Sequence, residues 1–133
     1  MTTDARVALT LDDRIPARGP LARHVEETSD LFAQRYASGP PARQHASVSL
    51  AWRLDGTAAD GDSLAVAGEE REGSGQVRPF AVRIPARQLA DRLGRNLWSN
   101  RLWYALLSAR SDDNMRRIES AIRQLEEDDE HGG

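Results

Sequence analysis

A run in the middle of the chain in which every second residue is apolar constrains its fold most strongly. From Ala46 to Leu54 every second side chain is apolar, and Ser47, Ser49 and Arg53 stand between them. This period of two places the apolar side chains on one face of a β-strand, whereas a helix would scatter them around its circumference. The chain therefore contains a strand that is buried on one face, and its sheet needs a covering layer.

Similar but weaker patterns predict three more strands, over residues 6–11, 63–67 and 77–84. Pro79 cannot donate a ladder hydrogen bond, so the last strand is expected to lie at an edge of the sheet or to begin after this residue. A helix is expected from Pro20 to the Ser38–Pro41 stop, because proline suits the first turn of a helix. One side of this helix is apolar and predicts its buried face: Leu21, Val25, Phe32 and Tyr36.

Three helices are expected after the last strand, over residues 85–93, 97–110 and 112–125. Gly94 is expected to end the first, and Ser111 to cap the third, since two acidic residues follow it in the first turn. The element order is then β-α-β-β-β-α-α-α, which predicts an α+β fold. Its sheet is expected to be small and antiparallel, with three or four strands, an N-terminal helix and a C-terminal module of three helices.

The length of 133 residues fits one domain, and charge is unevenly distributed along it. Residues 76–125 hold ten arginines and four acids, whereas all five residues of 126–130 are acidic. We therefore expect a single α+β domain over residues 1–125, with a basic helical module at 85–125, and an acidic, flexible tail at 126–133. The basic module favours an anionic partner, although solvated local ion pairs would give the same composition.

The composition excludes several kinds of chemistry. The chain has no cysteine, and all 18 of its lysine-or-arginine residues are arginine. Disulfides, thiolate catalysis, cysteine-ligated metals, lysine Schiff bases and the P-loop lysine are therefore excluded. The three histidines share no metal-ligand spacing, and no catalytic residue, cofactor or metal site is predicted. A small enzyme whose catalytic groups meet only in three dimensions stays an alternative.

The helix expected at 97–110 is apolar around most of its circumference, which suggests an interaction protein. Such a helix either forms the centre of the core or presents a second apolar face. In the second case Trp98 or Trp103 would point outward and anchor a partner protein, with arginines beside it. The predicted partner-binding residues are Trp98, Trp103, Arg95, Asn100, Arg101 and Arg110.

Another apolar stripe lies in the last expected helix, at Met115, Ile118, Ile122 and Leu125. These residues step by three and four positions, as in a helix that pairs with another helix. The second helix would belong to a partner protein or, in a homodimer formed through residues 112–127, to another copy of this chain. These features together predict a non-enzymatic interaction protein: an inhibitor, an adaptor or a small subunit of a bacterial, phage or plasmid complex.

Nucleic-acid binding is the main alternative. Residues 86–94, followed by a helix from Leu97, resemble the opening of a helix-turn-helix, although the second helix offers few polar side chains to base edges. Residues 20–93 follow the element order of a double-stranded-RNA-binding domain, but acids in their helix would repel phosphate. A nucleic-acid-binding regulator would use Arg87, Arg92, Arg95, Arg101, Arg116, Arg117 and Arg123.

Location and source are inferred from composition. No run of about 18 apolar residues is present, so no membrane partner is expected. The first 13 residues lack the basic start and the apolar stretch of a signal peptide, which predicts a cytoplasmic protein. Arginine in place of lysine, with many alanines, is typical of GC-rich coding sequences and favours a bacterial, phage or plasmid source. Gly132-Gly133 is similar to the end of ubiquitin-like modifiers, but the expected element order is not theirs.

Overall fold

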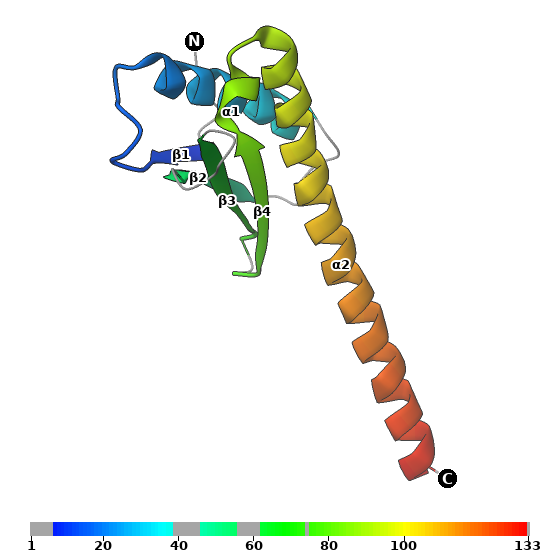
Figure 1. Cartoon of the computed structure of the whole chain (residues 1–133). Coiled ribbons are helices and arrows are strands. Elements are labelled where there is room, and N and C mark those ends of the chain that lie inside the picture. The colour runs from blue at the N-terminus through cyan, green and yellow to red at the C-terminus, as the bar shows by residue number, and fades with distance from the viewer. Residues whose placement is uncertain (1–6, 39–45, 56–61, 74, 133) are drawn as a thin grey trace.

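The structure, a computed structural model, describes residues 7–38, 46–55, 62–73 and 75–132. A single sheet carries two α-helices, and the second helix continues far beyond the sheet (Figure 1). The α+β class predicted from the sequence is therefore confirmed. The elements in chain order are β1 (Val7–Leu11), α1 (Pro20–Ser38), β2 (Ser47–Asp55), β3 (Ser63–Arg71), β4 (Val77–Pro85), the 3₁₀ helix η1 (Ala86–Leu89) and α2 (Arg92–Gly132).

The strands form one mixed sheet in the order β1-β2-β3-β4. β2 pairs with β3, and β3 with β4, in the antiparallel direction that was predicted. β1 and β2 are parallel, so the prediction of a purely antiparallel sheet was wrong. The reason is the connection between them: α1 carries the chain back along the sheet, so that β2 starts at the same end as β1, which a short turn would not permit.

Alternate side chains of β2 are buried beneath the helices, as the period of two predicted. Val48, Leu50 and Trp52 are buried, whereas Ser49 and Ala51 between them are exposed. Both helices cover the same face of the sheet, and the core lies between that face and the helices. The helices contribute to this core chiefly Val25, Phe32 and Tyr36 from α1 and Trp98, Leu102, Trp103 and Leu106 from α2.

β4 lies at an edge of the sheet, as Pro79 indicated, and its Phe80 packs across β3. Gly68 is the register partner of Phe80. A Cβ atom at position 68 would overlap the aromatic ring, so only glycine leaves room for it. This close approach of ring and backbone explains a glycine in the interior of a strand.

Gly68→Val is expected to lower the free energy of unfolding by about 1–3 kcal/mol, because the ring of Phe80 would have to leave its place in a packed core. Urea denaturation followed by tryptophan fluorescence measures this change. Ala67→Val is the matched control: Ala67 is exposed on the other face, so its stability should change by less than about 0.5 kcal/mol. Equal stability of both variants would show that Phe80 moves aside freely.

The C-terminal part of the chain contains one long helix, so the prediction of three helices was wrong. Only η1 lies where the first was expected, and Gly94 belongs to the first turn of α2 instead of ending a helix. Asp91 Oδ1 accepts a hydrogen bond from the Gly94 N–H at 2.7 Å, which caps α2. A Cβ at Gly94 would overlap the carbonyl of Gln88, so the tight entry into α2 requires glycine.

Ser111 does not start a new helix because nothing ends the preceding one. No glycine or proline occurs from residue 95 to residue 131. Ser111 and Asp112 are exposed, a setting in which residues that favour caps are tolerated inside a helix. α2 also includes residues 126–132, which were expected as a tail, and the flexibility of this segment stays a prediction. No helix within the described ranges is both long and apolar enough to cross a membrane.

Candidate functional site

Both tryptophans of α2 lie in the core. Trp98 and Trp103 are each 7% exposed, so neither indole points outward as a partner anchor would. The Trp98 Nε1 donates a hydrogen bond to Gln88 Oε1 at 2.8 Å. The tryptophans therefore belong to the core, and the large apolar side chains exposed between residues 97 and 110 are Leu97 and Tyr104.

The other predicted partner-binding residues do not form one surface with the tryptophans. Arg95 forms an ion pair with Glu27 of α1 at 2.9 Å and is mostly buried. Arg101 is exposed and lies over the ring of Trp98 at 4.6 Å. Asn100 has a buried Oδ1 without a hydrogen-bond partner among the described residues. Arg110 is bound to Glu70, so a partner surface built on these residues has no common exposed face.

The helix-turn-helix expected for a nucleic-acid-binding module is not formed by the described residues. Ala86–Leu89 is a single 3₁₀ turn, and the chain from Arg92 onward is one helix, so the second helix of the motif has no separate axis. Of the arginines proposed to read nucleic acid, Arg95 is paired with Glu27, and Arg117 lies 3.4 Å from Asp113. The arginines are distributed along and around α2 instead of forming one recognition surface.

Every large apolar side chain that α2 exposes lies on one face of this helix, which we call the outer stripe. At about 100° per residue, its members fall within roughly a quarter of the circumference, opposite the buried Leu102 and Leu106. Their exposed fractions range from 43% to 82%. The sequence analysis found the lower four of them, but not that the same face continues toward the sheet. The outer stripe consists of Leu93, Leu97, Tyr104, Met115, Ile118, Ile122 and Leu125.

The lower half of α2 projects from the fold without a neighbour among the described residues. Each residue from 114 to 128 is exposed, and Figure 1 shows this segment leaving the sheet behind. The 19 residues from 114 to the end of α2 span about 28 Å at 1.5 Å per residue. Isolated helices of this length are marginal in water, and an apolar stripe normally packs against another element. The projecting helix therefore carries an apolar face that the described residues leave exposed.

A buried ion pair fixes α2 to the sheet at the point where the projection begins. Arg110 approaches Glu70 of β3 with two nitrogens, at 2.9 Å from Nε to Oε1 and at 2.6 Å from Nη2 to Oε2. The hydroxyl of Tyr36 on α1 donates a hydrogen bond to the same carboxylate at 2.9 Å. The hydrogen bond with Glu70, opposed by burial, raises the pKa of Arg110 above its ordinary value. Arg78 of β4 also lies 3.4 Å from Glu70 Oε1, so two helices and two strands meet at one carboxylate that is 1% exposed.

Arg78 of β4 makes a second connection to α2, three residues further along the helix. Its Nη2 lies 2.6 Å from Glu72 Oε1, and its Nε lies 3.0 Å from Asp113 Oδ2. Burial opposes the charged form of Arg78, but the hydrogen bonds and charges of Glu72 and Asp113 outweigh this effect and raise its pKa. Gln76 also donates a hydrogen bond to Asp113 at 2.7 Å. These contacts set the direction in which the outer stripe leaves the fold.

Sequence reasoning missed this ion-pair cluster, although one signal for it exists. The strand that begins at Ser63 was expected to end at residue 67, whereas β3 continues to Arg71. Glu70 therefore lies an even number of residues after the buried Leu64 and Val66, so its side chain is on the same, inward face of the strand. A charged residue at an inward position predicts a buried partner of opposite charge. The sequence does not show that Arg110 is such a partner, because it lies 40 residues further along the chain.

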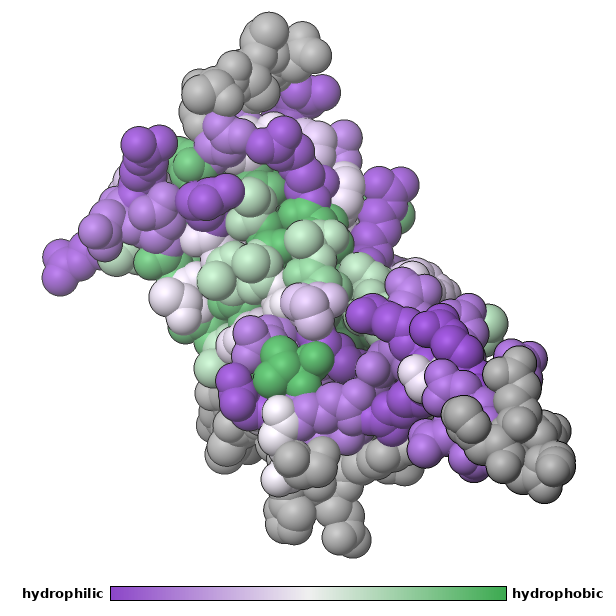
Figure 2. All heavy atoms as spheres, turned by 90° about the horizontal axis from the view of Figure 1, so that it is seen from below, coloured by the Kyte–Doolittle hydropathy of each residue, from purple (hydrophilic) through white to green (hydrophobic). Residues whose placement is uncertain are grey.

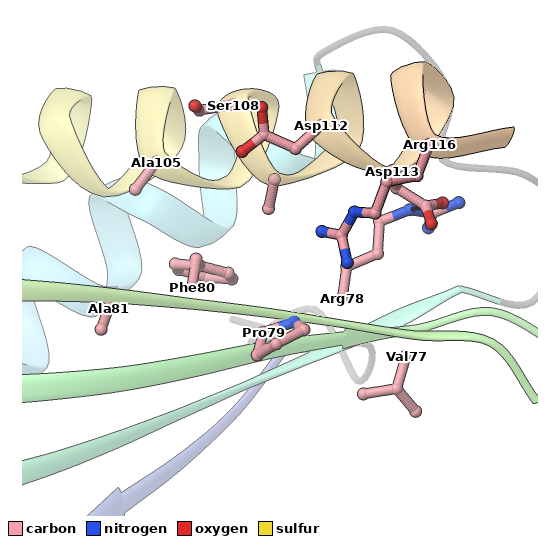
Figure 3. A pocket seen from close by; sticks show the side chains of 11 residues that line it. Val77, Arg78, Pro79, Phe80, Ala81, Ala105, Ser108, Asp112, Asp113 and Arg116 are labelled. Atoms are coloured by element: carbon pink, nitrogen blue, oxygen red, sulfur yellow. Dashed lines mark hydrogen bonds and ion pairs between the residues drawn. The ribbon is translucent and has the colours of Figure 1, made fainter. Parts of the chain in front are cut away.

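A hollow of about 340 Å³ lies between β4 and α2 (Figure 3). Figure 3 shows Phe80 and Arg78 pointing from the strand toward the helix, whereas Val77 points to the other side of the sheet. Arg78 is engaged with Asp113 on the opposite wall. No group of three or more histidines and acids that could hold a metal ion occurs among the described residues. Two of the charged side chains that line the hollow, Arg78 and Asp113, therefore already bind each other.

A wider hollow of about 680 Å³ covers the face of the sheet that carries no helix. Small side chains form most of its floor, among them Ala51, Ala65, Ala67 and Ala81, and Arg53 and Arg83 also line it. Seen from below in Figure 2, hydrophobic residues gather in a band through the middle of the molecule between hydrophilic margins. Alanine side chains supply no donor, acceptor or charge, so this floor gives little chemical basis for selecting a ligand.

Comparison with protein-family models, with curated proteins and with solved structures found no match.

Proposed function

We propose that this protein is a non-enzymatic interaction protein that binds a partner protein through the outer stripe of α2. The observation that carries the proposal is the set of exposed, aligned apolar side chains on a helix that projects from an otherwise packed fold. In this proposal Tyr104 and the aliphatic residues of the outer stripe anchor the partner, because the tryptophans are buried. An inhibitor, an adaptor or a small subunit of a larger complex would each use such a surface, and the cytoplasmic, bacterial or phage setting stays a prediction.

The size of the stripe indicates how much of α2 the partner has to cover. Full burial of one large apolar side chain contributes about 1.5–3 kcal/mol, and these side chains are roughly half exposed. Burying the remainder of the four lower residues would therefore contribute about 3–6 kcal/mol. Micromolar affinity requires about 8 kcal/mol after the cost of association is subtracted. The partner's facing side chains contribute a similar amount, and contact that extends upward along the stripe to Tyr104 and Leu97 adds further apolar burial.

Replacing Ile118 and Ile122 together by aspartate is expected to reduce binding of the natural partner at least about a hundredfold, because two carboxylates would have to lose water at the contact. Ser120→Asp with Gln124→Asp is the matched control, since these positions lie on the opposite side of the same exposed turns. The full chain and both variants would be used to capture proteins from nuclease-treated lysate of the native host. Binding of the captured partner is then measured with purified proteins.

The proposal requires that the control variant retains a partner which the stripe variant loses, while both variants keep the melting temperature of the original chain. Capture of the same proteins by all three chains would contradict it. Capture that disappears entirely after nuclease treatment would favour the nucleic-acid alternative instead.

A further inference from the structure

We propose that the outer stripe takes a helix of another protein whose flanking positions are basic, an inference that rests on the proposed function and adds the chemistry of the partner. The stripe assigns heptad positions to the projecting part of α2. Met115 and Ile122 occupy position a, and Ile118 and Leu125 occupy position d. The residues that border such a seam, at positions e and g, face the flanks of the partner helix and decide which partners are compatible.

One border of the stripe is acidic at every heptad. Asp112, Glu119 and Glu126 follow one another at intervals of seven residues, and all three are exposed. None of them forms an ion pair with another described residue. The other border, made of Asn114, Ala121 and Asp128, contains no cation.

The arginines of the projecting segment do not occupy the flanking positions themselves. Arg116 and Arg123 are at position b, four residues after Asp112 and Glu119 and therefore beside the acidic border, and Arg117 is at position c. The basic composition of the segment therefore does not describe its binding face, which is apolar at the centre and acidic at the margin.

A second copy of this chain does not complement the acidic border. In an antiparallel pair, positions e of the two helices face each other, so Glu119 and its neighbours would meet acids. In a parallel pair, Glu119 would face Asn114 and Glu126 would face Ala121, which supplies no attraction. The parallel pair would also bring two acidic runs of residues 126–130 together. Both arrangements lack the opposite charge that a basic helix from another protein provides.

Two synthetic helices of about four heptads test the inference directly. Both carry the same isoleucine and leucine seam, and they differ only in having arginine or glutamate at every flanking position. Binding to the full-length chain is measured by fluorescence anisotropy in about 0.1 M salt, where charges within about 10 Å still interact. We expect the arginine peptide to bind at least tenfold more tightly, since three attractive pairs replace three repulsive ones. This preference should shrink in 1 M salt.

A second experiment reverses the charge of the acidic border of the protein. Asp112→Arg, Glu119→Arg and Glu126→Arg together should invert the preference, so that the glutamate peptide binds more tightly. The control combines Ser120→Arg, Gln124→Arg and Glu127→Arg, which adds positive charge on the side of α2 opposite the stripe. This control should leave the preference for the arginine peptide at its original size.

Each remaining outcome separates this inference from the proposed function. Equal binding of both peptides, lost in the Ile118→Asp and Ile122→Asp variant, would overturn the charge inference and leave the stripe as the binding surface. Concentration-dependent dimerisation in sedimentation, with no peptide bound, would replace the basic partner by a second copy. Binding to vesicles containing anionic lipid, with no peptide bound, would replace it by a membrane surface. Failure of peptide binding, dimerisation and vesicle binding would overturn this inference, and the capture experiment with the stripe variant would decide the proposed function separately.

Discussion

Arg110→Met is expected to lower the free energy of unfolding by about 3–5 kcal/mol, because it leaves the buried Glu70 carboxylate with the more distant Arg78, at 3.4 Å, as its cation. Glu70 is 1% exposed, and Arg110 provides its two closest charged nitrogens. A domain of this size has a total stability of roughly 5–15 kcal/mol. The loss is therefore large enough to bring the variant close to unfolding at room temperature, which urea denaturation followed by circular dichroism would show.

Two further variants separate the ion pair from a general effect of losing an arginine. Arg123→Met removes an exposed arginine and should change the stability by less than about 0.5 kcal/mol. Glu70→Gln combined with Arg110→Met removes both charges and keeps an acceptor for the hydroxyl of Tyr36, so it should recover most of the loss. If Arg110→Met is no less stable than Arg123→Met, the cluster does not fasten α2 to the sheet.

Deprotonation of Arg110 is not expected to weaken its ion pair across the ordinary pH range. Its pKa is raised in the folded state, chiefly by the hydrogen bond with Glu70. A raised folded-state pKa gives a contribution that is fully present below the unfolded value and is lost only as the pH rises through the folded value. For arginine that window begins above about pH 12. Loss of the Arg110 proton therefore does not weaken the cluster at any pH below that window.

Local patterns predicted those parts of the fold that depend on local constraints. The alternation from Ala46 to Leu54 identified β2 and its buried face, because a strand reverses side with every residue. Pro79 identified an edge strand because it lacks a donor. The apolar steps from Met115 to Leu125 identified one helical face, although they could not show that the described part of the chain leaves this face exposed.

The features that sequence reasoning missed depend on distant contacts. The direction of β1 is set by the path of the connection through α1, which alternation does not encode. Ser111 and Asp112 favour a helix start locally, but continuous helix on both sides prevails over that preference. Glu70 meets Arg110 only because β3 and α2 pack together. The candidate site was therefore assigned to buried tryptophans, while the exposed face of the same helix carries the stripe.

A chain that ends at Arg117 is expected to keep the stability of the complete chain within about 0.5 kcal/mol and to lose partner binding about a hundredfold or more. Residues 118–128 are all exposed, so their removal breaks no packing of the core. Arg117 lies beside Asp113 and places a positive charge at the new helix end, where the helix dipole favours it. Urea denaturation measures the first expectation, and anisotropy with the arginine-flanked helix measures the second.

A chain that ends at Ala109 provides the contrast, since it lacks only eight more residues but loses Arg110 and Asp113 with them. It should be destabilised at least as much as Arg110→Met, because Glu70 and Arg78 both lose their contacts on α2. The two truncations thus divide α2 into a part that the fold needs and a part that it does not use. A large loss of stability on ending at Arg117 would mean that the projecting segment packs on the body of the same molecule, and the stripe would then be covered by its own chain instead of by a partner.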